Sequence, residues 1–299
     1  MSAKRTVLVT GATGNQGGAV ANALLSRGHS VRAFTRNPKS PTALHLARQG
    51  AELAMGDFSD TASVRRAASG ADTVFAMGTP FGSEVEEEIK EGMALADAAR
   101  AAGVGHLIYA SGASADRHTG IPYSDSKYRV EQYITSLGVP YTISAPVFFM
   151  QNLVSPWVLP ALRQGKLTMA LPAARKLQQI AVGDIGEFVA ALVDRREAVF
   201  GRRFDIAGDE LSGEEMAAIL SRVSGREIHY EGFPAEALRA ESEDSALVWE
   251  WFDRVGFAVD IGGLRRDFPE VRWHRFEDWA REKDWSALLE ASSGNLVAP

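Results

Sequence analysis

The sequence contains no cysteine, so disulfide bonds, thiolate metal ligands and a thiol redox switch are all excluded. Its six histidines show no metal-binding spacing such as His-x-x-x-His or His-Glu-x-x-His, and we expect no metal site. We interpret His106 and His118 as surface residues. No apolar run approaches the roughly 20 residues that a membrane-spanning helix needs. These absences predict a protein with neither a metal site nor a membrane as its partner.

A surplus of positive charge is missing as well. The chain of 299 residues carries 32 lysines and arginines against 38 aspartates and glutamates, a formal net charge of −6. This balance argues against a general nucleic-acid-binding surface. Residues 1–5 lack the layout of a signal peptide, so we expect a cytoplasmic protein that acts on a small-molecule substrate. The sequence leaves a homodimer open.

Strand and helix signals alternate through the first half of the chain. Short apolar runs predict strands at residues 6–9, 31–35, 52–55, 72–76, 107–110 and 139–144. Helical periodicity and terminal glycines predict helices at residues 19–27, 43–49, 61–68, 84–102 and 124–137. Strands that alternate with helices imply a parallel sheet with right-handed crossovers. The predicted fold class is α/β, a doubly wound parallel sheet of the Rossmann type.

The pattern changes in the second half of the chain. Prolines interrupt residues 146–178, at Pro146, Pro156, Pro160 and Pro172. Regular elements return with a helix near 185–193 and a strand at 203–206, which we expect to rejoin the sheet. The predicted domains are therefore discontinuous: residues 1–151 and about 179–208 bind NAD(P), and residues about 152–178 and 209–299 form a smaller C-terminal α/β lobe for substrate.

A glycine loop follows the first predicted strand. Residues 10–18 read Thr-Gly-Ala-Thr-Gly-Asn-Gln-Gly-Gly, with Gly11, Gly14 and Gly17 spaced as G-x-x-G-x-x-G. Gly11 permits a tight turn, Gly14 lets the backbone approach a pyrophosphate, and Gly17 allows close packing of helix on strand. The helix N-terminus then offers N–H groups to the phosphates. A plain tight turn is the alternative, but the position between strand and helix favours a dinucleotide.

Further cofactor contacts are expected where the next strands end. Arg36 stands where NAD-preferring sites commonly hold an acidic residue, and its planar fork suits the 2′-phosphate of NADP; a solvated surface arginine is the alternative. Asp57 is placed to accept a hydrogen bond from the adenine amino group, although Asp57 or Asp60 as a helix cap is nearly as good an interpretation. NADP(H) is therefore favoured over NAD(H). The remaining expected contacts at the loop and along this edge are Thr13, Asn15, Gln16, Phe58, Met77, Gly78 and Thr79.

A tyrosine and a lysine form the candidate catalytic pair. Tyr123 and Lys127 are separated by one helical turn, so their side chains face the same way. A nearby ammonium lowers the phenol pKa from its usual value of about 10, and the tyrosine can then pass a proton to a carbonyl oxygen as hydride arrives. Lys127 can also hold the nicotinamide ribose. Ser111, at the end of the fifth strand, is placed to orient the substrate oxygen, while a partly exposed helix pair is the structural alternative.

These features resemble the short-chain dehydrogenase/reductase superfamily and, within it, the atypical NmrA-like group. The resemblance rests on residues 10–18, 35–38, the Tyr123–Lys127 pair, 146–152 and 275–279, and it covers nearly the whole chain. The double glycine of the loop is its most specific motif. The resemblance implies a Rossmann core, a smaller C-terminal lobe with substrate in the cleft between them, NADP binding, and a nicotinamide cradled near Pro146, Val147, Phe148 and Phe149.

Members of this group divide in function. Some are reductases of quinones, dyes or other carbonyl and conjugated compounds, and others are regulators that sense the NADP(H) balance, often with the tyrosine replaced. Tyr123 is present here, which favours catalysis. Either Ser111 or Ser114 aligns with the family's serine, and Gly112 is a third candidate for that position.

Other residues are assigned by their position after strand ends or on helices. The expected substrate pocket contains Phe81, Ser114, Phe149, Asn152 and Trp157. The run of charges over residues 84–91 is interpreted as a solvated helix face. The C-terminal tryptophans either line an apolar pocket or join the small lobe to the core; they are Trp249, Trp251, Trp273, Trp279 and Trp285.

The sequence supports one main hypothesis and two alternatives. The main hypothesis is an NADPH-dependent reductase of a small, largely apolar carbonyl, quinone-like or conjugated compound. The first alternative is a non-catalytic NADP(H)-sensing regulator, which needs the glycine loop but not Tyr123. The second is an isomerase or epimerase with tightly held NAD, which the small C-terminal lobe and Arg36 disfavour.

Overall fold

The computed structural model describes residues 3–78 and 85–290, which divide into two compact units. The first comprises residues 1–146, 182–205 and 268–272, and the second residues 147–181, 206–267 and 273–299. Both are discontinuous in sequence, as the return of a strand after residue 200 suggested. The first unit also includes a short segment at 268–272, which no sequence pattern indicated.

A seven-stranded sheet forms the centre of the first unit. Its order is β10-β6-β5-β4-β1-β2-β3, and β1 through β6 pair in parallel along it. The strands are β1 (Thr6–Val9), β2 (Ser30–Thr35), β3 (Glu52–Met55), β4 (Thr73–Ala76), β5 (His106–Ala110), β6 (Tyr141–Pro146) and β10 (Arg202–Ile206). This is the Rossmann order, and it confirms the predicted fold class and the return of residues 203–206 to the sheet.

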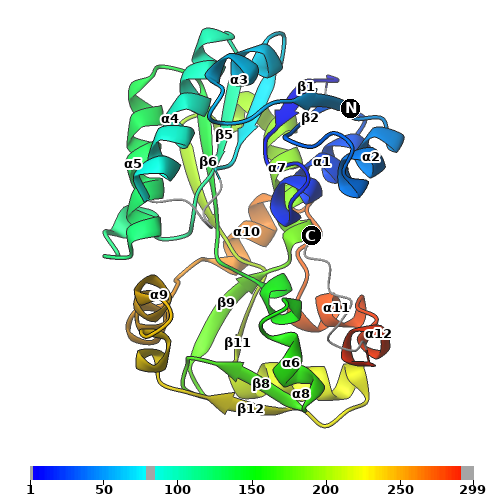
Figure 1. Ribbon diagram of the computed structural model, residues 1–299, viewed down its shortest axis with the longest axis vertical. Helices are drawn as coiled ribbons and strands as arrows, with labels where there is room; N and C mark the ends of the chain where they lie inside the picture. Colours follow the sequence, from blue (N-terminus) through cyan, green and yellow to red (C-terminus); the bar gives the residue numbers. More distant parts are fainter. Residues whose placement is uncertain (1–2, 79–84, 291–299) are drawn as a thin grey trace. The chain divides into compact units, whose positions relative to one another are not determined.

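Helices cover both faces of this sheet. Figure 1 shows α3, α4 and α5 on one face and α1, α2 and α7 on the other. They are α1 (Asn15–Ser26), α2 (Pro41–Arg48), α3 (Thr61–Ala68), α4 (Val85–Ala101), α5 (Pro122–Ser136) and α7 (Val182–Arg195). The central strands are buried along their whole length because both faces are covered; every residue of β4 and β5 is buried. The strand order reverses between β1 and β4, so the loops after these two strands face each other at the carboxyl edge of the sheet.

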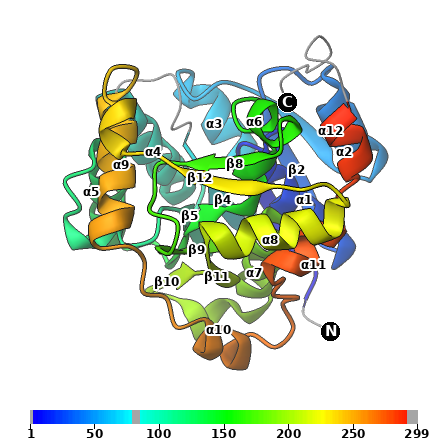
Figure 2. The same ribbon diagram turned by 90° about the horizontal axis from the view of Figure 1, so that it is seen from below.

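The second unit contains two small sheets and six short helices among the described residues. Its strands are β7 (Phe148–Phe149), β8 (Lys166–Met169), β9 (Lys176–Ile180), β11 (Asp209–Ser212) and β12 (His229–Gly232). Its helices are α6 (Leu159–Arg163), α8 (Gly213–Ser224), α9 (Glu243–Arg254), α10 (Ile261–Asp267), α11 (Phe276–Arg281) and α12 (Trp285–Glu290). Sheet β11-β9-β7 and sheet β12-β8 are separate, and Figure 2 shows α8 lying along the latter. The tryptophans Trp251, Trp279 and Trp285 are buried in this unit's own interior.

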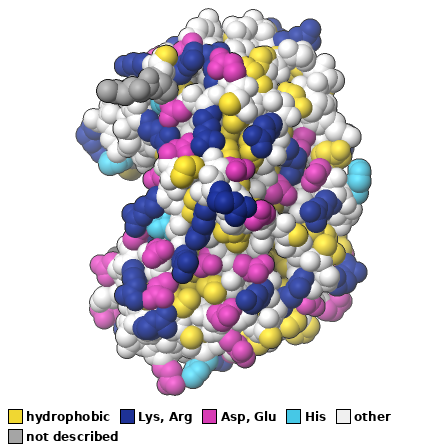
Figure 3. All heavy atoms as spheres, turned by 180° about the vertical axis from the view of Figure 1, so that it is seen from behind, with side chains coloured by type: hydrophobic (Ala, Val, Ile, Leu, Met, Phe, Trp, Pro, Cys, Tyr) yellow, Lys and Arg dark blue, Asp and Glu magenta, His cyan; other side chains and the backbone are white. Residues whose placement is uncertain are grey.

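Charges of both signs are interspersed on the face drawn in Figure 3, where Lys and Arg side chains alternate with Asp and Glu. This face therefore lacks the continuous basic surface that a nucleic-acid backbone attracts. Within residues 3–78 and 85–290, no helix is both long and apolar enough to cross a bilayer.

Candidate functional site

The glycine loop joins β1 to α1, and close contacts leave no room for a side chain at two of its three glycines. Gly11 has φ +60°, in the left-handed region, and a Cβ there would overlap the methyl group of Met77. A Cβ at Gly17 would collide with the carbonyl oxygen of Gly11, so the first turn of α1 packs directly on the loop. A Cβ at Gly14 would meet only the carbonyl oxygen of Gly11, at an ordinary 3.5 Å. Two of the three glycines are thus required by the fold itself, and Gly14 is not.

The N-terminus of α1 is prepared for an anion. Gly14 is the N-cap residue, no side chain caps the helix, and its first turn holds no acidic residue. Gly14 and Asn15 are exposed, while Thr13 is partly buried. The side chain of Gln16 is buried, and its Nε2 has no hydrogen-bond partner among the described residues. A buried amide donor without a partner is unusual, because leaving it unpaired destabilises the fold by about 1–3 kcal/mol.

The ends of β2 and β3 bring Arg36, Asp57 and Phe58 to the same edge. Arg36 is exposed directly after β2. The hydroxyl and backbone N–H of Ser59 donate to Oδ1 of Asp57 at 2.7 and 2.9 Å, and these bonds, with the charge of Arg36, lower the pKa of Asp57. Asp60, not Asp57, caps α3, by accepting from the N–H of Ala62. Asp57 is therefore an ionised acceptor beside a cation.

The loop after β4 is fastened to the glycine loop by one hydroxyl. Thr10 Oγ1 accepts from the N–H of Met77 at 2.8 Å and donates to the carbonyl oxygens of Phe75 and Met77. The predicted contacts Met77 and Gly78 thus lie beside the glycine loop, with Gly78 buried. Thr79 and Phe81 fall outside the described residues.

Lys127 does not stand in solvent beside its tyrosine but makes a buried ion pair. Both Tyr123 and Lys127 lie in the first part of α5, one turn apart, with Tyr123 partly buried. Lys127 Nζ donates to Oε1 of Glu88 at 2.8 Å, and the two side chains are only 9% and 5% exposed. Ser126 Oγ donates to the other oxygen, Oε2, at 2.8 Å. We call Glu88, Ser126 and Lys127 the lysine cluster.

Glu88 corrects the interpretation of residues 84–91 as a solvated face. Among the described residues of that run, Glu86 and Glu87 are exposed, but Glu88 is buried and only 4% of its surface is accessible. Its helix face explains this: Gly92, Leu95 and Ala99 follow it at helical spacing and are all buried. The helical periodicity of α4 therefore indicates that Glu88 is buried. The many charged residues around it led to the wrong interpretation.

Ser111 lies at the end of β5 within a second set of buried charges. Its hydroxyl donates to Oε1 of Glu131, and Arg203 Nε donates to Oε2 of the same carboxylate at 2.9 Å. Arg203 also donates to the carbonyl oxygen of Gly112 at 2.8 Å and to Asp205. Burial raises the pKa of Glu131 and of Asp205, although Arg203 opposes the shift in both. We call Ser111, Glu131, Arg203 and Asp205 the arginine cluster.

Ser114, the other candidate for the family's serine, lies in a buried turn held by Asp205. It is buried and has φ 63°, in the left-handed region. Its backbone N–H donates to Oδ2 of Asp205 at 3.1 Å. Asp205 and Arg203 therefore fix the loop from Ser111 to Ser114 at both of its ends.

The remaining predicted cofactor and pocket residues belong to the segment after β6. Pro146 ends β6, and its carbonyl oxygen accepts from the N–H of Ala113. Val147 is buried, and Phe148, Phe149 and Asn152 are half-buried in the second unit. Phe148 packs against Trp249 of α9, with ring centroids 5.9 Å apart. Trp157 is 76% exposed, so it lines no enclosed pocket within its own unit.

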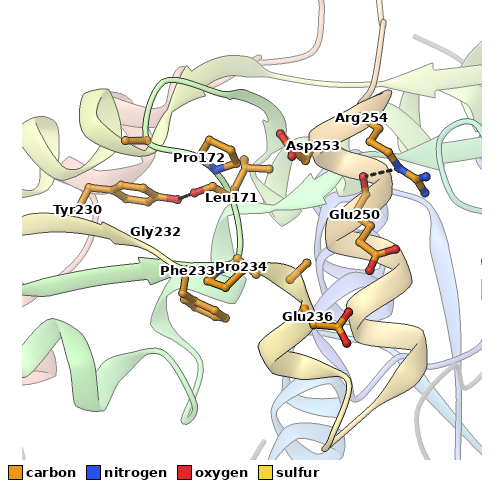
Figure 4. A pocket seen from close by; sticks show the side chains of 13 residues that line it. Leu171, Pro172, Tyr230, Gly232, Phe233, Pro234, Glu236, Glu250, Asp253 and Arg254 are labelled. Atoms are coloured by element: carbon orange, nitrogen blue, oxygen red, sulfur yellow. Dashed lines mark hydrogen bonds between the residues drawn. The ribbon is translucent and has the colours of Figure 1, made fainter.

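A hollow of about 620 Å³ opens in the second unit, as Figure 4 shows. Its walls come from residues 170–173, from the end of β12 with the following turn, and from the last turn of α9. Tyr230 closes one side, where its hydroxyl donates to the carbonyl oxygen of Leu171 at 2.6 Å, and burial raises the pKa of Tyr230 to about 12. Glu236 and Glu250 stand at the opposite side. None of the pocket residues expected from the sequence lines this hollow.

The histidines and acidic residues of the described chain form no metal-binding group. His118 is exposed as expected. The prediction for His106 is wrong: this residue is fully buried at the start of β5, where its Nε2 lies 2.8 Å from Thr142 Oγ1. Burial lowers the pKa of His106 to about 3, with the charge of Arg196 adding to the shift. His106 is a neutral core residue.

Two known proteins with related sequences are named as reductases. The (4-alkanoyl-5-oxo-2,5-dihydrofuran-3-yl)methyl phosphate reductase of Streptomyces griseus is 33% identical over 236 residues, or 78% of this chain and 79% of that protein. The NAD(P)H azoreductase of Xenophilus azovorans is 30% identical over 226 residues, or 75% of this chain and 76% of that protein.

The fold is also that of a solved structure. Citrobacter sp. triphenylmethane reductase complexed with NADP(H) superposes with a TM-score of 0.79 at 20% identity, over 93% of this chain and 99% of that chain. At this identity the likeness establishes the fold alone. The sequence model of the NmrA-like family matches residues 3–250. The chain belongs to the NmrA-like family.

Proposed function

We propose that the protein is an NADPH-dependent reductase that delivers hydride to a small, largely apolar carbonyl, quinone-like or conjugated compound, with Tyr123 as the proton donor. The observation that carries the proposal is a continuous run of contacts along the carboxyl edge of the sheet. Met77 packs against Gly11, the adjacent Gly78 lies beside Glu88, and Glu88 binds Lys127. A phosphate-binding loop and a buried ammonium therefore belong to one site.

The loop fits a bound dinucleotide. Its helix N-terminus carries no capping side chain, Gly14 is exposed, and the unpaired Nε2 of Gln16 supplies a donor with no protein acceptor among the described residues. Arg36, exposed after β2, suits a 2′-phosphate, and ionised Asp57 suits the adenine amino group. We assign the first unit to the dinucleotide and the second unit to the substrate.

The chain's own chemistry is proton transfer. When bound, NADPH supplies the hydride. Tyr123 donates its phenolic proton to the substrate oxygen, which gains negative charge as the substrate carbon accepts the hydride. The Lys127 ammonium stabilises the phenolate that remains. The hydroxyl proton of Ser111 already bonds to Glu131, so polarising the substrate oxygen through Ser111 requires that bond to break.

Replacement of Tyr123 by phenylalanine tests the proposal. Loss of the hydroxyl should lower kcat for carbonyl or quinone reduction by about 100-fold or more, with the Kd for NADPH changed by less than about threefold. Tyr128→Phe, on the same helix, is the matched control and should leave both unchanged. Unchanged turnover in the Tyr123 variant would exclude the tyrosine mechanism.

A non-catalytic NADP(H) sensor is the second candidate. The bond from Ser111 to Glu131 favours it, because it occupies a hydroxyl that a reductase of this type would use. A sensor would bind NADPH with no turnover across a panel of carbonyls and quinones. It would also show protein binding that differs between NADPH and NADP⁺.

A further inference from the structure

Lys127 is a cation almost out of contact with water, and among the described residues it pairs with one carboxylate, that of Glu88. Its Nζ lies 2.8 Å from Glu88 Oε1, and Glu88 Oε2 accepts from Ser126 Oγ, so both carboxylate oxygens are used. An ammonium carries three N–H groups. Among the described residues, Glu88 is the acceptor for one of them, and no bond to the other two is formed.

Close packing of two helices creates this pair. A Cβ at Gly92 of α4 would lie 2.8 Å from Val130 of α5, closer than real contacts allow, so only glycine permits this approach. Gly92 stands one turn after Glu88, and Val130 lies about one turn after Lys127. The glycine therefore brings the carboxylate of one helix to the ammonium of the next.

The pair faces the carboxyl ends of β4 and β5. A Cβ on Gly78, after β4, would lie 3.7 Å from Glu88 Cγ, and one on Gly112, after β5, would lie 3.8 Å from Lys127 Cδ. Ordinary contact at both points places the lysine cluster on the same edge as the glycine loop. The two N–H groups of Lys127 that Glu88 does not use are thus available to hydroxyl groups of a molecule bound there.

The neighbouring titratable groups do not replace Glu88 as a counterion. Tyr109, on β5, is a neutral phenol because burial, and then the charges of Glu88 and Glu131, raise its pKa well above the ordinary value. Glu131, farther along α5, is bound by Arg203 of β10. A buried ammonium without a paired anion releases its proton more readily.

We infer that Glu88, which lies outside the tyrosine–lysine motif, is a positioning residue that keeps Lys127 protonated and holds its ammonium at the cofactor edge. The role in the reaction rests on the proposed function, whereas the effect on Lys127 does not. Glu88 acts through Lys127 and touches no reacting atom. The motif in this chain is then a tyrosine, a lysine and a carboxylate from the preceding helix.

The direct test follows the protonation of Lys127 in the cofactor-free protein. With ¹³C-labelled lysine, the Cε signal of Lys127, assigned by its loss in Lys127→Met, is titrated with pH. Glu88→Gln keeps the side-chain shape but removes the charge, and we expect Lys127 to lose its proton at least one pH unit lower than in the wild type. The matched control is Glu86→Gln, because exposed Glu86 pairs with Arg129 across the same two helices and its loss should leave Lys127 unchanged. An unshifted titration in Glu88→Gln would overturn the inference.

Activity provides the second measurement. For reduction, the alkaline limb of the kcat/KM profile should move to lower pH by at least one unit in Glu88→Gln, since either Lys127 or Tyr123 then loses its proton earlier. Glu88→Asp keeps the charge and should return the titration most of the way to wild type, which also decides the matter if the glutamine variant does not fold. An aspartate variant that titrates like glutamine would count against a role for the charge. Absence of turnover in the wild type would remove the proposed function, while the titration would still decide the role of Glu88.

Discussion

The lysine cluster and the arginine cluster each place a carboxylate that acts on the buried Tyr109, and they use their cations differently. Arg203 donates to Glu131, to Asp205 and to the carbonyl oxygen of Gly112, so each of its three nitrogens has an acceptor. Lys127 donates to one acceptor among the described residues. Both clusters bury charge, but only the lysine cluster leaves N–H groups without an acceptor among the described residues, at the carboxyl edge of the sheet.

This difference separates a fully bonded network from one with unused N–H donors. A fully bonded buried network fixes the backbone around it, and removing one member leaves charge unpaired. Arg203 and Asp205 fix the loop from Ser111 to Ser114 in this way. A buried cation with unused donors can form further hydrogen bonds without breaking the ones it has.

The largest expected effect is on the arginine cluster. Arg203→Met leaves the carboxyl groups of Glu131 and Asp205 buried without their cation, and it should lower the free energy of unfolding by about 3–5 kcal/mol, measured by urea denaturation at pH 8. Arg202→Met, at an exposed neighbour on the same strand, should change it by less than about 1 kcal/mol. A small effect at Arg203 would remove the distinction between the two clusters.

His106 extends the comparison to a buried group without a counter-charge. Its folded pKa of about 3 is below the ordinary 6.5, so the unfolded chain binds the proton first as pH falls. Its contribution to stability is complete above pH 6.5 and is lost on acidification towards pH 3. Wild type should lose about 2–3 kcal/mol more than His106→Gln between pH 6 and pH 4. Carboxyl contributions largely cancel in this difference, and parallel pH curves for the two proteins would refute the assignment.

Arg36 carries the comparison to an exposed cation. If it binds the 2′-phosphate, Arg36→Ala should raise the Kd for NADPH about thirtyfold, or about 2 kcal/mol, and leave stability unchanged. The Kd for NADH should change by less than about threefold. Lys39→Ala, at another exposed cation of the same loop, is the control. Equal weakening of both cofactors would remove the argument for NADPH.

Ser111 gives the smallest expected effect. If its hydroxyl serves Glu131, Ser111→Ala should lower stability by about 1 kcal/mol, because Arg203 still holds the carboxylate. Turnover should fall less than about tenfold. A large loss of kcat with unchanged stability would instead assign Ser111 to the substrate oxygen.

The elements of the first unit could be predicted from the sequence almost one by one, because glycines bound its strands and clearly periodic helices alternate with them. Residues 52–55 and 61–68 match β3 and α3 as observed. The strands of the second unit could not: prolines interrupt residues 146–178, where β8 begins and β9 follows, and β11 and β12 are short segments rich in polar residues. Local patterns carry little information about such strands.

In the candidate site as well, local features could be predicted and contacts between distant elements could not. The glycine loop could be predicted because a turn between a strand and a helix is a local feature of the sequence; its glycines are Gly11, Gly14 and Gly17. Glu88 was not, because its partner lies on another helix and the contact depends on the absence of a side chain at Gly92. Ser111 was placed correctly at the end of β5, but the carboxylate that holds it comes from α5.

The buried pair of Glu88 and Lys127 also constrains how this site changes during evolution. A carboxylate with 5% exposure is tolerated because an ammonium faces it. The loss of either partner alone leaves the other as an unpaired charge in the interior. The two positions should therefore change together. Relatives that have exchanged the lysine for a neutral residue, as a lineage abandoning catalysis would, should carry a neutral residue at the position of Glu88 as well.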